Sequence, residues 1–95
     1  MAIAVYFHLK GMTLEQFNEI HRRLEEAGNG KNPHRLHHSC LGEEGDLMVY
    51  DIWDSPESFQ AFGEVLMPIT AAVGVDPGAP AVMPLHKLIQ TSAEI

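Results

Sequence analysis

Apolar residues alternate with polar ones in some stretches of the chain and recur at helical spacing in others. The alternating stretches are Ala2–Leu9, His34–Leu41, Asp46–Trp53 and Ala81–Gln90. Alternation over about eight residues is typical of a β-strand that packs one side against a core. Here the second side is also rich in apolar residues, as in Ala4 and Tyr6 of the first stretch. The pattern therefore predicts a sheet that is apolar on both faces.

The first helical pattern begins after Thr13. Thr13 is followed three residues later by Gln16, the arrangement of a capping box in which each side chain satisfies a free backbone N–H. Apolar residues then recur three and four apart until Gly28-Asn29-Gly30. Glycine and asparagine tolerate the left-handed conformation at a helix end, so the helix is predicted to end there.

The second helical pattern has a clear start at Ser55 and Pro56. Serine is a favourable N-cap, and proline fits the first helical position because its missing N–H has no partner there. Pro68 lies inside the pattern and removes one backbone hydrogen bond, so a kink or a break is expected there. Gly74 is predicted to end this helix.

The connections complete the order of elements. Gly42-Glu43-Glu44-Gly45 predicts a hairpin turn, and Val75–Pro80 predicts a rigid loop. Thr91–Ile95 is expected to be a loose tail or a short arm onto a partner. The order strand, helix, strand, strand, helix, strand is the ferredoxin-like βαββαβ arrangement, an α+β fold with a four-stranded antiparallel sheet and both helices on one face. Residue Pro84 places the last strand at a sheet edge or beside a bulge, because proline cannot donate to the ladder.

The second apolar face of such a sheet needs a cover. Soluble monomers avoid large exposed apolar patches, and a twofold dimer buries two such faces against each other. The sequence therefore predicts a homodimer.

Composition narrows the possible functions. The 95 residues are expected to form a single domain over residues 1–95, and a net charge of −7 with no large basic cluster argues against nucleic-acid binding. No apolar run reaches the ~20 residues of a membrane span, and no secretory signal pattern is present, so membrane binding is not expected. The only cysteine, Cys40, is expected to be buried and free, which favours the reducing cytoplasm.

Three segments carry a resemblance to a known group of proteins. They are LMVYDIWDSPESFQAF, VLMPIT and PLHKLI. Over about residues 2–90 the chain resembles the dimeric α+β barrel superfamily, which includes antibiotic-biosynthesis monooxygenases, stress-responsive barrel proteins and small haem-degrading enzymes. The resemblance implies a cavity between sheet and helices, with Trp53 lining it. The haem-binding members take an axial histidine from a helix, and here only His21 lies in a predicted helix.

The candidate chemistry lies in strand histidines and one carboxylate. Asp51 falls between Val49 and Trp53 on one strand face, where a carboxylate is costly unless it is paired. A histidine partner explains its placement, because an Asp–His pair orients the ring, fixes its tautomer and raises its basicity. The strand patterns of His8, His38 and His86 suggest burial on at least one side. Asp51, His38 and His86 are the predicted catalytic residues.

A second set of residues is predicted to contact a ligand. Aromatic residues near Trp53 form the simplest core between sheet and helices, and strand positions add a tyrosine and a histidine. With Trp53, these residues are Tyr6, His8, Phe17, His21 and Phe62. His21 lies on the apolar stripe of the first helix, where packing at the core boundary is the simpler interpretation. His34 and His37 are expected to face solvent or to support the hairpin.

Three functional hypotheses follow. The first is an enzyme of the monooxygenase type without an organic cofactor, in which Asp51 and a histidine deprotonate a small apolar or aromatic, phenol-like substrate so that it reacts directly with oxygen. The second is a non-catalytic module that binds a small molecule or acts as a structural dimer. The third is a metal or haem protein. No HxH or HxxxH pair supports a metal site, and no metal ligand is assigned.

Overall fold

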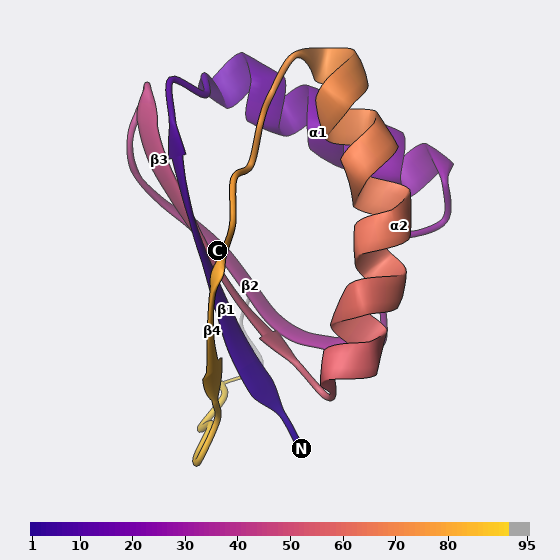
Figure 1. Ribbon diagram of the computed structural model, residues 1–95, viewed down its shortest axis with the longest axis vertical. Helices are drawn as coiled ribbons and strands as arrows, with labels where there is room; N and C mark the ends of the chain where they lie inside the picture. Colours follow the sequence, from indigo (N-terminus) through magenta and orange to yellow (C-terminus); the bar gives the residue numbers. More distant parts are fainter. Residues whose placement is uncertain (92–95) are drawn as a thin grey trace.

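The chain folds in the predicted order of six elements. The computed structural model describes residues 1–91. The elements are β1 (Ile3–Lys10), α1 (Leu14–Glu26), β2 (Arg35–Glu43), β3 (Asp46–Trp53), α2 (Pro56–Val73) and β4 (Ala81–Pro84). The predicted tail Thr91–Ile95 lies, apart from Thr91, outside the described residues. Figure 1 shows the sheet as one layer and the two helices as a second layer on a single side of it.

The four strands are antiparallel in the order β2-β3-β1-β4. Alternate residues of β1 and β3 face the helices and form the core, among them Val5, Phe7, Leu47 and Trp53. The ferredoxin-like α+β fold is therefore confirmed. The opposite side of the sheet is called the outer face here. By strand alternation it carries Ala4, Tyr6 and His8 of β1, His37, Ser39 and Leu41 of β2, Met48, Tyr50 and Ile52 of β3, and Ala81 and Met83 of β4.

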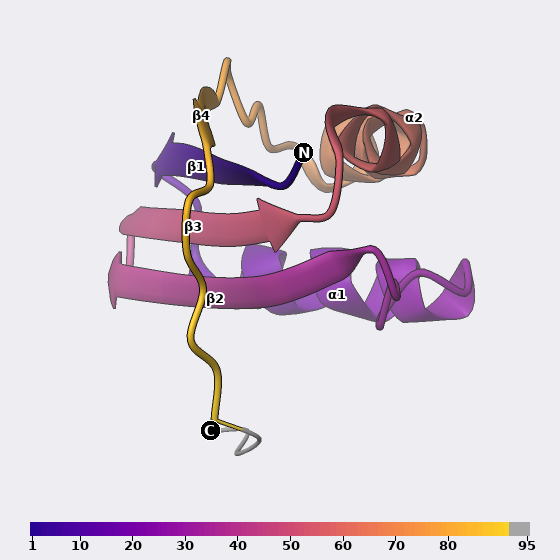
Figure 2. The same ribbon diagram turned by 90° about the horizontal axis from the view of Figure 1, so that it is seen from below.

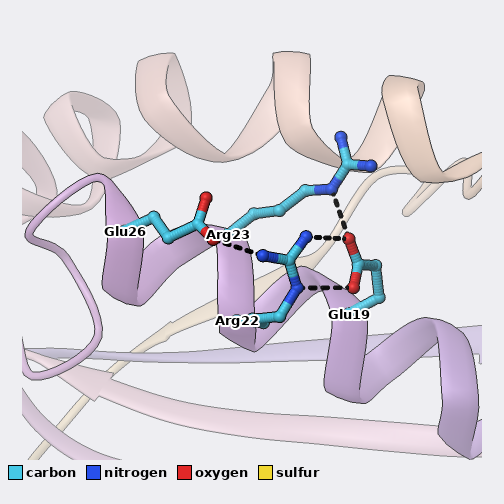
Figure 3. A network of polar contacts seen from close by, with 4 residues as sticks. All are labelled: Glu19, Arg22, Arg23 and Glu26. Atoms are coloured by element: carbon cyan, nitrogen blue, oxygen red, sulfur yellow. Dashed lines mark hydrogen bonds and ion pairs between the residues drawn. The ribbon is translucent and has the colours of Figure 1, made fainter.

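Helix α1 begins with the predicted capping box. The Gln16 amide N–H donates to the Thr13 hydroxyl, and the Thr13 amide donates to the Gln16 side chain. Ile20 and Leu24 are buried on the side that faces the sheet. The solvent side carries an ion-pair network in which Glu19 accepts from Arg22 and Arg23, and Arg22 also donates to Glu26 (Figure 3). These contacts lower the pKa of Glu19 to about 2.

Helix α2 begins with the predicted cap, since the Ser58 amide donates to the Ser55 hydroxyl. The helix then continues through Pro68 to Val73, so the predicted break does not occur. The missing N–H of Pro68 removes one hydrogen bond, but packing of Phe62 and Thr70 into the interior holds both halves in one helix. No helix within residues 1–91 is both long and apolar enough to cross a membrane.

The last strand is shorter than predicted. The predicted strand Ala81–Gln90 ends as β4 at Pro84, because proline has no N–H to donate to the ladder with β1. The Leu85 amide makes one further bond to the Ala2 carbonyl, and the chain then crosses the outer face towards β2 (Figure 2). There the Gln90 side-chain amide donates to the Leu36 carbonyl. On this face Ala4 and Ile52 are buried although they face away from the helices.

A β-bulge changes the predicted face of one residue on β2. The register shifts between Arg35 and His37, so Leu36 does not share a face with His38 and Cys40 as the alternation predicts. Arg35 pairs with Trp53 instead and faces the helices, while Leu36 is left partly exposed. A bulge inserts one unpaired residue and cannot be recognised from a two-residue period.

Candidate functional site

A cavity of about 60 Å³ lies between the sheet and the helices. Its wall is mostly apolar, with contributions from Phe7, Leu9, Met12, Ile20, Leu24, Val49, Leu66 and Val75. Among these apolar groups lie four side chains able to carry charge, which are His21, Arg35, His38 and Asp51. A cavity of about 150 Å³ holds a benzene ring, so this space encloses at most part of a single-ring ligand.

Asp51 and His38 form the predicted pair. Their strands place them opposite each other, and the His38 Nδ1 to Asp51 Oδ1 distance is 2.5 Å. Asp51 is only 3 % exposed. A buried carboxylate is costly without a partner, so this contact accounts for its presence in the core. Because a carboxylate only accepts, the contact assigns the Nδ1 proton to His38 and leaves its Nε2 as an acceptor.

His21 extends the pair from α1. Its Nε2 atom lies 3.1 Å from His38 Nε2, so Asp51, His38 and His21 form a continuous network of hydrogen bonds. Phe17, one turn earlier on the same helix, holds both imidazoles: its ring centroid lies 4.4 Å from that of His21 and 6.1 Å from that of His38. The boundary packing predicted for His21 is thus combined with a direct polar contact to the Asp–His pair.

His21 is neutral near pH 7. Burial lowers its pKa to about 4, and the charge of His38 when protonated and that of Arg35 act in the same direction. With His38 Nε2 as the acceptor, the neutral His21 ring donates its Nε2–H and keeps Nδ1 unprotonated. The arrangement can therefore accept a proton at His21 and pass one to His38, where the Asp51 carboxylate stabilises the resulting positive charge.

Three of the six predicted ligand contacts, His21 among them, line this cavity, and three, His8 among them, do not. Phe17 and Phe62 are part of its wall. Trp53 is not, since its side chain is fully buried beneath Phe59 and Phe62 and is 0 % exposed. Tyr6 lies on the outer face opposite Tyr50. The alternation places Trp53 on the correct face but cannot tell a core residue from a cavity wall.

Two predicted histidines lie elsewhere, contrary to the burial suggested by their patterns. His8 is exposed on the outer face, with its Nε2 2.6 Å from Asp46 Oδ1. His86 follows the end of β4 and is exposed, because the strand predicted to contain it stops at Pro84. As predicted, His34 and His37 lie near the surface, and His34 Nδ1 contacts Asp54 Oδ2 at 2.7 Å.

Sequence reasoning missed Arg35. Its guanidinium reaches the cavity because of the bulge, and its Cζ atom lies 5.3 Å from the centroid of the Phe62 ring. No sequence signal for that bulge is present in the alternation. Cys40 packs against the core and does not line the cavity, and burial raises the pKa of its thiol. Within residues 1–91, no cluster of three or more histidine, cysteine, aspartate and glutamate side chains is arranged to hold a metal ion.

Comparison with known proteins gives structural matches only. No protein-family model matches the chain, and no curated protein matches it. A structure from Caulobacter crescentus CB15, of a protein proposed to be an antibiotic biosynthesis monooxygenase, has a TM-score of 0.63 at 22 % identity and covers 93 % of this chain and 91 % of its own. SnoaB from Streptomyces nogalater, a cofactor-independent oxygenase, has a TM-score of 0.62 at 14 % identity, with coverage of 95 % and 97 %.

A third structure is a dimeric protein of unknown function and ferredoxin-like fold from Bacteroides fragilis NCTC 9343. It has a TM-score of 0.51 at 12 % identity and covers 88 % of this chain and 96 % of its own. At these identities the likeness establishes the fold. The chain therefore has the ferredoxin-like fold of the antibiotic-biosynthesis-monooxygenase-like proteins, which confirms at the level of fold the resemblance seen in its sequence.

Proposed function

We propose that this protein is a small cofactor-independent enzyme of the monooxygenase type. The observation that carries the proposal is the hydrogen-bonded network of Asp51, His38 and His21 inside an apolar cavity. A neutral imidazole backed by a buried carboxylate is a general base near neutral pH. Similarity in fold to SnoaB, itself a cofactor-independent oxygenase, supports the choice of chemistry.

The proposed substrate is a small, phenol-like molecule. His21 or His38 removes its hydroxyl proton, and the positive charge comes to rest on His38 beside Asp51. The resulting phenolate is electron-rich and reacts directly with O₂, which is the oxidant. One oxygen atom enters the product as a quinone carbonyl and the other leaves as water, so a phenol and O₂ give a quinone and water. The cavity volume of about 60 Å³ limits the enclosed part of the substrate to a single ring at most.

The test measures oxygen uptake and quinone absorbance with a panel of single-ring phenols. Replacing the general base or its carboxylate, in His38→Gln and Asp51→Asn, is expected to lower the rate by about 100-fold or more. The matched control is Asp46→Asn, which removes the equivalent contact to His8 on the outer face. That control is expected to keep the wild-type rate.

Two results would overturn the proposal. One is a rate in Asp51→Asn equal to that of the wild type. The other is tight phenol binding without oxygen uptake by any phenol of the panel, which is the behaviour of a non-catalytic binding module.

We also infer that the active form is a homodimer that packs through the outer face. Two large apolar side chains of that face, Leu41 and Met83, are each 45 % exposed. They lie on the edge strands β2 and β4, on either side of Tyr6 and Tyr50. Soluble proteins commonly cover such patches with a second copy. The one cysteine, Cys40, is in keeping with a single cytoplasmic domain.

A further inference from the structure

Arg35 differs from the other arginines, whose guanidinium groups donate hydrogen bonds to acidic side chains. Arg22 and Arg23 on α1 both pair with Glu19 in the solvent network of Figure 3. Arg35 has no carboxylate within salt-bridge distance among residues 1–91; its one hydrogen bond there runs from Nη2 to the Gly30 carbonyl at 3.5 Å. A guanidinium has five N–H donors, so most of its capacity is unused.

The surroundings of Arg35 are apolar. Its Cζ atom lies over the ring of Phe62 at 5.3 Å and over that of Trp53 at 6.0 Å. Aromatic faces stabilise the cation and hold the planar group in place. They do not satisfy its N–H donors. Burial also lowers the pKa of this guanidinium, while the charge of Asp51 acts in the opposite direction.

The guanidinium opens on the same cavity as the Asp51, His38 and His21 set. Asp51 makes its short contact with His38 rather than with Arg35. The cavity therefore contains an arginine whose donors are free for a ligand, beside a base and an apolar wall. A planar guanidinium binds a carboxylate through two parallel hydrogen bonds. This interaction is strongest where water is excluded.

We propose that Arg35 binds a carboxylate of the substrate, so that the substrate class is a small apolar acid of at most one ring. The proposal rests on the proposed function only in taking this cavity as the substrate site. The carboxylate fixes one end of the molecule at Arg35 and the apolar body lies against Phe62 and Leu66. The opposite end then faces the histidines, which orients the hydroxyl group to be deprotonated.

The experiment measures binding of benzoate and of its neutral isostere benzamide by calorimetry, without turnover. Wild-type protein is expected to bind benzoate about 10-fold or more tightly than benzamide, as expected for a charge-assisted contact. Arg35→Met keeps the packing against Phe62 and Trp53 and is expected to remove this preference. Arg35→Lys keeps the charge without the fork and is expected to retain only part of it. The control Arg22→Met, in the solvent network, is expected to keep all of it.

A second measurement uses the unaltered protein, in case Arg35→Met does not fold. The side-chain Nε–H resonance of Arg35 is expected to shift when benzoate is added and to stay in place when benzamide is added. Equal binding of the two molecules by wild-type protein, or a preference that survives in Arg35→Met, overturns the inference. Oxygen uptake plays no part in either measurement, so a failure of the proposed reaction is distinguishable from a failure at Arg35.

Discussion

The same residue pair occurs three times in this chain with different consequences. His8 contacts Asp46 at 2.6 Å, His34 contacts Asp54 at 2.7 Å, and His38 contacts Asp51 at 2.5 Å. In the first two pairs, water competes for both partners because their side chains are substantially exposed. In the His38–Asp51 pair, Asp51 is buried and a second histidine, His21, contacts the His38 ring. Burial, and not the contact itself, separates a candidate base from two surface pairs.

The depressed pKa of His21 predicts how stability depends on pH. The folded protein holds His21 neutral down to a pH of about 4, whereas the ordinary value is 6.5, so the unfolded chain binds this proton at higher pH. Stability linked to His21 is therefore fully present above about pH 6.5, is lost as the pH falls, and levels off near pH 4. Urea unfolding of wild type and His21→Gln across this range is expected to show a steeper loss in the wild type. Equal slopes would contradict the shift.

At the scale of elements, the two helix starts are decided by short local signals. The capping box at Thr13 and the N-cap at Ser55 appear in the structure with the partners that their spacing predicts. These contacts involve residues three apart, so the surrounding fold has little influence on them. The end of β4 is different, because it depends on the ladder with β1, in which Pro84 lacks the donor that a longer strand requires.

The Ser55 cap predicts a measurable stability change. Ser55→Ala leaves the Ser58 amide without its acceptor and is expected to lower the free energy of unfolding by about 1 kcal/mol. Ser55→Asp retains an oxygen at this position and adds a negative charge at the helix start, so it is expected to stay near the wild-type value. Chemical denaturation compares the three proteins. A loss in Ser55→Asp as large as that in Ser55→Ala would argue against the cap.

At the scale of the whole molecule, the outer face combines exposed apolar residues with a segment of its own chain. The residues after β4 cross this face (Figure 2), and its residues Ala4 and Ile52 are buried. Leu41 and Met83, at the two edges of the sheet, stay exposed. The crossing segment thus reduces the apolar surface that a partner has to bury, and it places residues 85–91 within the proposed interface.

The proposed dimer predicts a specific response to charge on the outer face. Both Leu41 and Met83 are half exposed in the monomer. The double substitution Leu41→Glu with Met83→Glu is therefore expected to change the monomer's free energy of unfolding little. Two carboxylates per chain in the interface are expected to convert the dimer to a monomer in sedimentation velocity. Met67→Glu is the matched control, since Met67 is 54 % exposed on α2 away from that face. A doubly substituted protein that stays dimeric would place the interface elsewhere.

The sequence by itself determined the order of the elements and the need of Asp51 for a histidine partner, but it left open which face of the sheet carries that pair. Alternation and helical spacing depend on residues a few positions apart, and they correctly placed β3, both caps, and Asp51 on the same strand face as Trp53. The tertiary structure showed that this face is the one towards the helices. Hydrophobic periodicity is a local property, so it can be recognised in one segment without knowledge of the neighbouring elements.

Only the tertiary structure decided which side chains share the cavity. It added His21 from α1 and Arg35 from the bulge, enclosed Trp53 in the core, and left His8 and His86 at the surface. Each outcome depends on strand order, on one unpaired residue in β2, or on where a proline ends a ladder. The physical reason is that a cavity is the space left when distant segments pack, and its lining is fixed by contacts that no local pattern contains.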